Sequence, residues 1–142
     1  MTKIVRLLAA AVLALSALQA GAQRLPVPIV NHEHVELRRV DGQPPTASQV
    51  HDAVLAASQA TGRKWAVTEQ GPGRLLATYH VRTHTISTGI RYGDGQLSMV
   101  YADSINMKYA PGGEKGTGII HPFYNQWVDE FLQAIRLELS RS

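Results

Sequence analysis

The sequence predicts an α+β domain, a four-stranded antiparallel meander with both helices packed on one face, in the order (β)-α-β-β-β-β-α. Residues 46–61 and 121–139 carry apolar side chains at every third or fourth position, which indicates two amphipathic helices. Residues 64–102, between them, alternate apolar and polar side chains and are divided by turn sequences, as in half-buried strands. Short connections make a meander covered by two helices the simplest arrangement.

The first 22 residues predict a secretory signal peptide. Lys3 and Arg6 precede the apolar run 7–18, and Ala20-Gly21-Ala22 offers small residues before a cleavage point. The alternative is a short membrane anchor, but the run is shorter than the roughly 20 apolar residues that span a bilayer. We therefore expect cleavage after Ala22, a periplasmic protein and no membrane anchor after cleavage. The chain has no cysteine, so neither a lipidated cysteine nor a disulfide is available.

The composition of the exported part argues against nucleic-acid binding. Cleavage after residue 22 removes two basic residues and no acidic one, which leaves 12 basic and 11 acidic residues in 120. A nearly neutral chain lacks the excess of basic residues that nucleic-acid binding requires. Its length fits one domain, and no sequence motif indicates a cofactor.

The N-terminal part begins with an extension, residues 23–45, whose stretch 29–40 contains a possible edge strand. The helix over 46–61 begins with a capping box, in which Thr46 and Gln49 satisfy each other's backbone N–H groups. Its apolar side comprises Val50, Ala53, Val54, Ala57 and Ala60. Gly62 then ends the helix, because glycine adopts a positive φ without penalty. Residues 46–142 form the single α+β domain.

Four strands are expected over 64–70, 74–82, 84–92 and 96–102. Pro72-Gly73 and Asp94-Gly95 mark two of the turns, and the length of 74–92 requires another near Arg82-Thr83. Pro122 suits the start of the last helix. The apolar side of that helix comprises Tyr124, Trp127, Val128, Phe131, Leu132, Ile135 and Leu139.

Three motifs together are similar to those of a family of small exported bacterial proteins, many of them lipoproteins, to which no activity is attached. The first is Trp65 followed by the Pro72-Gly73 turn and Arg82-x-His84. The others are the stretch Tyr101-x-Asp-Ser-x-Asn-x-x-Tyr109 and the stretch Ile120-His-x-x-Tyr-Asn-x-Trp127. The resemblance covers about residues 44–137. It implies a fold and an exported location and no reaction, and the lipidated cysteine of the family is missing here.

Polar residues of these motifs are the candidate site. They are expected near one end of the sheet, either as a polar lock, in which the side chains satisfy one another, or as a small-ligand site. The lock is favoured because it requires no partner. The candidates are Arg82, His84, Asp103, Ser104, Asn106, His121, Tyr124 and Asn125.

Two alternatives remain open at this point. A hydrolase could use His84 or His121 with Asp103, although no nucleophile-elbow sequence surrounds Ser104. A metal-binding protein could use histidines, since His32 and His34 would share one face of a strand, but no metal-ligand spacing motif is present.

The sequence therefore favours a small periplasmic binding or envelope-associated accessory protein without a catalytic motif. Its partner would be an unidentified protein or small ligand of the cell envelope. No cofactor and no metal site are predicted.

Overall fold

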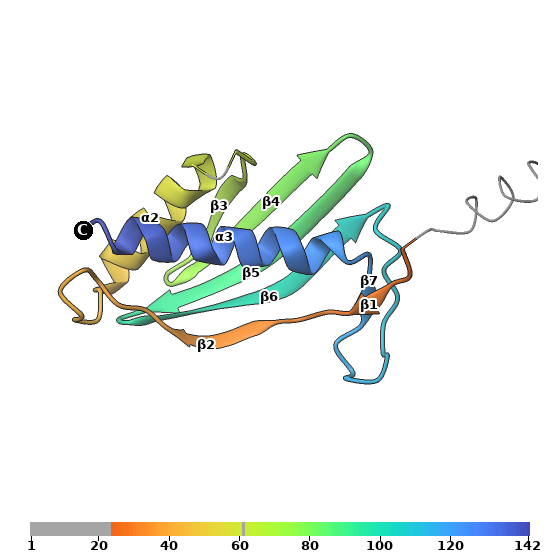
Figure 1. Ribbon diagram of the computed structural model, residues 1–142, viewed down its shortest axis with the longest axis horizontal. Coiled ribbons are helices and arrows are strands. Elements are labelled where there is room, and N and C mark those ends of the chain that lie inside the picture. The colour runs from red at the N-terminus through yellow and green to blue at the C-terminus, as the bar shows by residue number, and fades with distance from the viewer. Residues whose placement is uncertain (1–23, 61) are drawn as a thin grey trace, which may run out of the picture.

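The computed structural model describes residues 24–60 and 62–142 and confirms the α+β fold (Figure 1). The predicted signal peptide, residues 1–22, lies outside the described residues. In the part of the chain that the structure describes, no helix is long and apolar enough to cross a membrane. The elements are β1 Val27–Pro28, β2 His32–Glu36, α2 Ala47–Ala60, β3 Ala66–Gly71, β4 Arg74–Val81, β5 His84–Gly93, β6 Gln96–Ile105, β7 Ile119–Ile120 and α3 Phe123–Leu139.

Five antiparallel strands form the main sheet in the order β2-β6-β5-β4-β3, so β3 to β6 are the predicted meander. The possible edge strand is present as β2, which pairs with β6. All three predicted turns occur between consecutive strands. Arg82, in the turn between β4 and β5, has a φ of 55°, a left-handed conformation that glycine and asparagine adopt more readily than arginine.

The capping box of α2 is formed as predicted. The Thr46 hydroxyl accepts a hydrogen bond from the backbone N–H of Gln49 (3.2 Å), and the Gln49 side chain accepts one from the backbone N–H of Thr46 (2.9 Å). Four of the five expected apolar residues of this helix are buried, but Ala60 is exposed. The helix begins at Ala47, where the sequence places its first turn.

All seven residues predicted for the apolar side of α3 are buried. They join the buried residues of α2 and of the central strands in one hydrophobic core, so both helices cover the same face of the sheet. Aromatic rings connect the layers: Trp65 stacks on Phe131 at a centroid distance of 4.8 Å, and Tyr79 meets the edge of Trp127 at 5.2 Å. Such pairs add about 0.5–1.5 kcal/mol each beyond the burial of their surface.

The N-terminal segment is held to α3 by hydrogen bonds. The Asn125 side chain donates to the carbonyl oxygen of Pro28 and accepts from the N–H of Val30, both at 3.0 Å. The Thr117 hydroxyl donates to the carbonyl oxygen of Ile29 (2.8 Å), and Ile29 is buried. The amide of Asn125, one of the candidate site residues, thus fastens residues 28–30 through two hydrogen bonds.

Two parts of the chain differ from the expected boundaries. Strand β1 pairs with β7, a short ladder inside a stretch that the sequence indicates as irregular. Strand β6 continues to Ile105 rather than ending at Ala102, because a bulge at Ala102 lets pairing with β5 resume.

We expect Asn125→Ala to destabilise the protein by about 1–3 kcal/mol, because the amide N–H of Val30 and the carbonyl of Pro28 lose their partners. Urea unfolding followed by circular dichroism measures the change. Gln126→Ala, which removes an exposed neighbouring amide, is the control and should cost far less. Equal effects of the two substitutions would contradict the role assigned to Asn125.

A second prediction concerns His51, which joins α2 to β3. Its Nε2 lies 2.6 Å from Glu69 and its Nδ1 3.2 Å from Asp52, and these two carboxylates raise the pKa of the imidazole, Glu69 the more strongly. A histidine whose pKa is higher in the folded than in the unfolded state stabilises the fold when it is protonated. This contribution to the free energy of unfolding is complete below the unfolded pKa of about 6.5 and is lost as pH rises through the folded pKa.

Between pH 5.5 and pH 8.5, the wild type should therefore lose about 0.2–1 kcal/mol more stability than His51→Asn, because the carboxylate partners are exposed. Urea unfolding at both pH values tests this. An identical pH dependence in the two proteins would show that the ion pairs of His51 contribute nothing to stability.

Candidate functional site

His84 and Asn106 contact each other at one end of the sheet. The Nδ1 of His84 donates to the carbonyl oxygen of Asn106 (2.7 Å), and the Asn106 side chain donates to the Thr83 hydroxyl (2.8 Å). Asn106 has a φ of 56°, and its backbone is therefore in the left-handed region that asparagine tolerates better than most residues. These contacts tie the β4–β5 turn to the segment that follows β6. Arg82 lies exposed in the same turn.

Ser104 takes part in a second group, around Tyr101. The hydroxyls of Tyr101 and Ser104 lie 2.8 Å apart, and the Asp103 carboxylate accepts a hydrogen bond from the backbone N–H of Ser104 (2.9 Å). The Tyr101 ring meets the edge of the Tyr124 ring at 5.5 Å. Tyr124 is buried, and burial strongly raises the pKa of its phenol, so it packs as a neutral core residue.

His121 lies just before α3 and acts as a helix cap. Its Nδ1 accepts the backbone N–H of Phe123 (3.1 Å), and its ring packs against the Phe123 ring at 4.7 Å. Burial lowers the pKa of His121, and the nearby charges of Lys108 and Arg24 lower it further. The neutral imidazole is the form that can accept this hydrogen bond.

These positions do not assemble the hydrolase that the sequence left open. Asp103 is the partner of Ser87 on β5, whereas His84 lies on the same side of β5 as the buried Ile86. Because side chains alternate between the two faces of a strand, Asp103 and His84 point to opposite sides of the sheet. The Ser104 hydroxyl meets a tyrosine and not a histidine.

The histidines also do not converge as a metal-binding protein would require. A bulge between His32 and Val35, together with a φ of 53° at His34, breaks the alternation that would have placed His32 and His34 on one face. Among residues 24–60 and 62–142, no three histidine, aspartate or glutamate side chains come together in a group that could hold an ion. The expected cluster thus consists of small groups of side chains, with hydrogen bonds that fix the chain.

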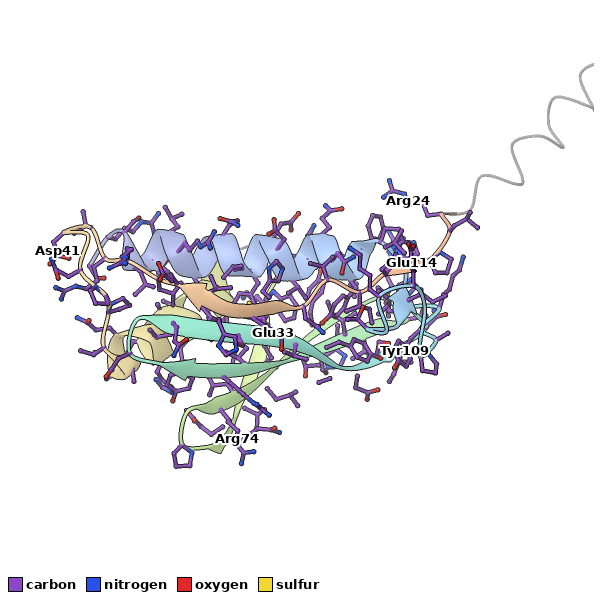
Figure 2. All side chains as sticks on the ribbon, turned by 90° about the horizontal axis from the view of Figure 1, so that it is seen from below. Arg24, Glu33, Asp41, Arg74, Tyr109 and Glu114 are labelled. Carbon is purple, nitrogen blue, oxygen red and sulfur yellow. The ribbon has the colours of Figure 1, made fainter. Side chains whose placement is uncertain are left out.

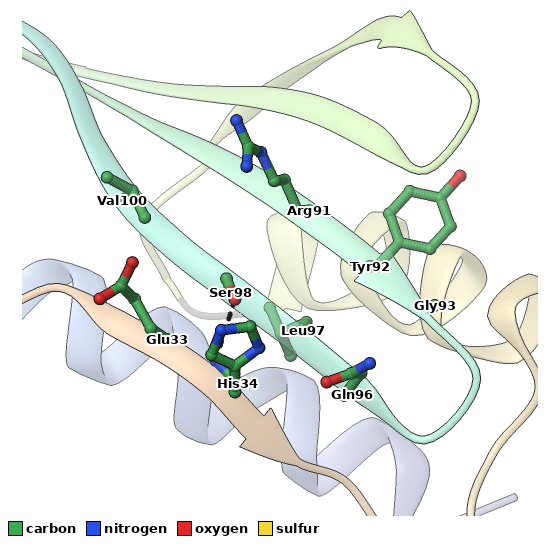
Figure 3. A pocket seen from close by; sticks show the side chains of 9 residues that line it. All are labelled: Glu33, His34, Arg91, Tyr92, Gly93, Gln96, Leu97, Ser98 and Val100. Carbon is green, nitrogen blue, oxygen red and sulfur yellow. Dashed lines mark hydrogen bonds between the residues drawn. The ribbon is translucent and has the colours of Figure 1, made fainter.

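The face of the sheet opposite the helices carries a second arrangement, which the sequence did not indicate. Arg74 and Arg91 are direct cross-strand partners on β4 and β5, and both are exposed. Like charges in such positions repel each other and destabilise a sheet. Figure 2 places Arg74 on the far side of the sheet from α3, and Figure 3 views Arg91 from the helix-free side.

Both arginines border an open hollow of about 410 Å³ on this face, here called the outer-face hollow. The residues that line it include Glu33, Gln70, Arg74, Arg91 and Val100, with Gly89 at its floor. A smaller hollow of about 240 Å³ adjoins it along β2 and β6 and shares Glu33, Arg91 and Val100 with it (Figure 3). Volumes of a few hundred cubic ångströms are typical of small-molecule sites.

The charged groups of the outer-face hollow are largely unused by the fold. Within the described residues, Arg91 and Glu33 make no hydrogen bond and no ion pair through their side chains. Arg74 donates one hydrogen bond, from Nη2 to the carbonyl oxygen of Gln70 (3.3 Å). The remaining N–H groups of the two guanidinium groups that line this hollow are therefore available to an anion, for which arginine offers planar, two-point hydrogen bonding.

Comparisons of this chain with protein-family models, with curated proteins and with solved structures find no match. The resemblance carried by the three sequence motifs therefore stays a prediction.

The cap role of His121 predicts a pH effect opposite in sign to that of His51. Because the pKa of His121 is lowered in the folded state, its neutral imidazole stabilises the fold. This contribution to the free energy of unfolding is complete above the unfolded pKa of about 6.5 and is lost as pH falls through the folded pKa. Asparagine can accept the Phe123 N–H without titrating.

Between pH 7.5 and pH 5.0, the wild type should therefore lose stability relative to His121→Asn, by on the order of 0.5 kcal/mol, because solvent screens the interactions of this partly exposed imidazole. Denaturant unfolding at the two pH values measures the difference. A larger loss in His121→Asn than in the wild type would refute the cap role.

Proposed function

We propose that this protein is a non-enzymatic binding module of the bacterial cell envelope that holds an anionic group of its ligand in the outer-face hollow. The observation that carries the proposal is the pair Arg74 and Arg91, two exposed cross-strand partners whose side chains both border an open hollow. A cross-strand pair of like charges costs stability, and an anion between them would reverse the sign of that interaction.

The use of the other polar residues supports a binding role over a catalytic one. His84, Ser104 and His121 are engaged with a backbone carbonyl, a tyrosine hydroxyl and a backbone N–H, respectively. A general base needs a free lone pair directed at a substrate proton and a nucleophile in hydrogen-bond reach. His84 keeps a lone pair on Nε2, but among the described residues no hydroxyl nucleophile bonds to that nitrogen, and the bonds of Ser104 and His121 serve the fold.

The proposed location rests on the N-terminal sequence. Residues 1–22 have the basic start, apolar run and small residues of a secretory signal, and the chain contains no cysteine. An exported module of this size would meet the ligands available in the envelope.

The proposal predicts saturable binding of propionate, a carboxylate with a short apolar stem, to the purified protein. We expect a dissociation constant in the millimolar range, because a single exposed ionic contact contributes little free energy. Arg91→Gln and Arg74→Gln should each weaken binding by about 5-fold, which corresponds to about 1 kcal/mol. Ligand-observed NMR titration provides the measurement, and added salt should weaken binding.

Arg38→Gln is the matched control. Arg38 is also exposed, but it lies outside the outer-face hollow and near Glu36. Its substitution should leave propionate binding unchanged. Binding that survives the loss of both Arg74 and Arg91 would overturn the proposal.

A further inference from the structure

We infer that the outer-face hollow takes a zwitterionic ligand of the amino acid or short peptide class. In this arrangement the ligand carboxylate binds between Arg74 and Arg91, its ammonium group meets Glu33, and a small apolar part lies over Gly89. The inference rests on the proposed function, which requires only the anionic group.

The charges around the hollow favour a ligand with both signs. Glu33 borders the same hollow as the two arginines, and no ion pair within 4.0 Å joins it to either of them. A ligand that is only anionic would gain from the arginines and be repelled by the Glu33 carboxylate. A ligand with a carboxylate at one end and an ammonium group at the other satisfies all three side chains.

The spacing of the strands fits a short peptide. Glu33 comes from β2 and Arg91 from β5, with β6 between them, so their backbones are separated by two strand spacings, about 10 Å. Both side chains are long and exposed, and both reach the hollow. An extended dipeptide spans about 7 Å, which places its two termini within reach of both groups.

Gly89 forms the floor of the hollow, and the fold gives no reason for a glycine there. Its φ is not in the positive region, and a β-carbon at this position would meet only the carbonyl oxygen of Val100, at an ordinary contact distance of 3.7 Å. Glycine within a strand is unfavourable compared with β-branched residues. The missing side chain keeps the floor open beside the apolar wall of Val100, and Ala102, also in the lining, is small.

Asp103, an acidic residue on the same face, does not compete with the ligand's carboxylate for the two arginines. Asp103 pairs in register with Ser87, two positions along β5 from Gly89 and on the side away from Arg91. Its carboxylate accepts the Ser104 N–H. Asp103 therefore lies apart from the end of the hollow that the two arginines border.

Three probes test the inference by isothermal titration: alanyl-leucine, N-acetyl-alanyl-leucine and alanyl-leucine amide. For the wild type, we expect the free dipeptide to bind most tightly, and removal of either charge to weaken binding by about 5-fold or more, equivalent to about 1 kcal/mol. In Glu33→Gln, the free and N-acetylated dipeptides should bind equally, because the partner of the ammonium group is gone. A preference for the free dipeptide that is present in the wild type and lost in Glu33→Gln supports the inference.

The outcomes separate this inference from the proposed function. If the wild type binds the free and acetylated dipeptides equally, and Arg91→Gln weakens both, an anion site exists but the zwitterionic ligand is wrong. If neither dipeptide with a free carboxylate binds and propionate does not bind either, both proposals fail.

Gly89→Val provides a second, independent test. Valine favours strands, so the variant should be at least as stable as the wild type in urea unfolding. Its side chain would occupy the floor of the hollow, and alanyl-leucine should bind about 5-fold or more weakly, an effect of about 1 kcal/mol. A variant that is equally stable and binds the dipeptide as the wild type does would overturn the placement of the ligand over Gly89.

Discussion

The structure depends on one packing constraint, namely that the apolar sides of both helices share a single face of the sheet. The seven buried residues of α3 and the stripe of α2 form one core with the inward side chains of the strands. Antiparallel sheets accept such one-sided cover, because alternate residues of each strand can face water. With two helices and a short chain, the opposite face stays open (Figure 1). Asn125 and His121 on the covered side fasten the chain through hydrogen bonds. On the open side, Arg74 makes a single hydrogen bond, and Arg91 makes none within the described residues.

The parts of the fold that follow from local periodicity could be predicted from the sequence. The buried residues of α3 recur at helical spacing, and the alternation in β4 to β6 fixes which side chains point inward. The capping box of α2 is a local pattern as well. Strands β1 and β7 could not be predicted, because two-residue strands carry no periodicity and depend on contacts distant in sequence, such as that of Asn125 with Pro28. The bulge at Ala102 likewise depends on pairing with β5.

The candidate site was harder to predict, because polar residue types do not reveal whether they are already bonded. His84, Ser104 and His121 have the side chains of a catalytic centre, yet each bonds within the fold. The outer-face hollow was not predicted, although two features of the sequence are consistent with it. A two-residue turn at Arg82-Thr83 makes Arg74 and Arg91 equidistant from the turn and hence cross-strand partners. Gly89 interrupts a strand-forming stretch, a pattern that often marks a close approach of another group.

The central claim is that the ligand meets the helix-free face of the sheet, while the polar motif residues hold the chain together. A backbone ¹H–¹⁵N NMR titration of the labelled protein with alanyl-leucine tests it most directly. The account predicts that the largest shift changes fall on the amides of Gly89, Arg91 and Val100, with those of His84 and His121 unchanged. Changes concentrated at His84 and His121, with the strands around Gly89 unaffected, would contradict it.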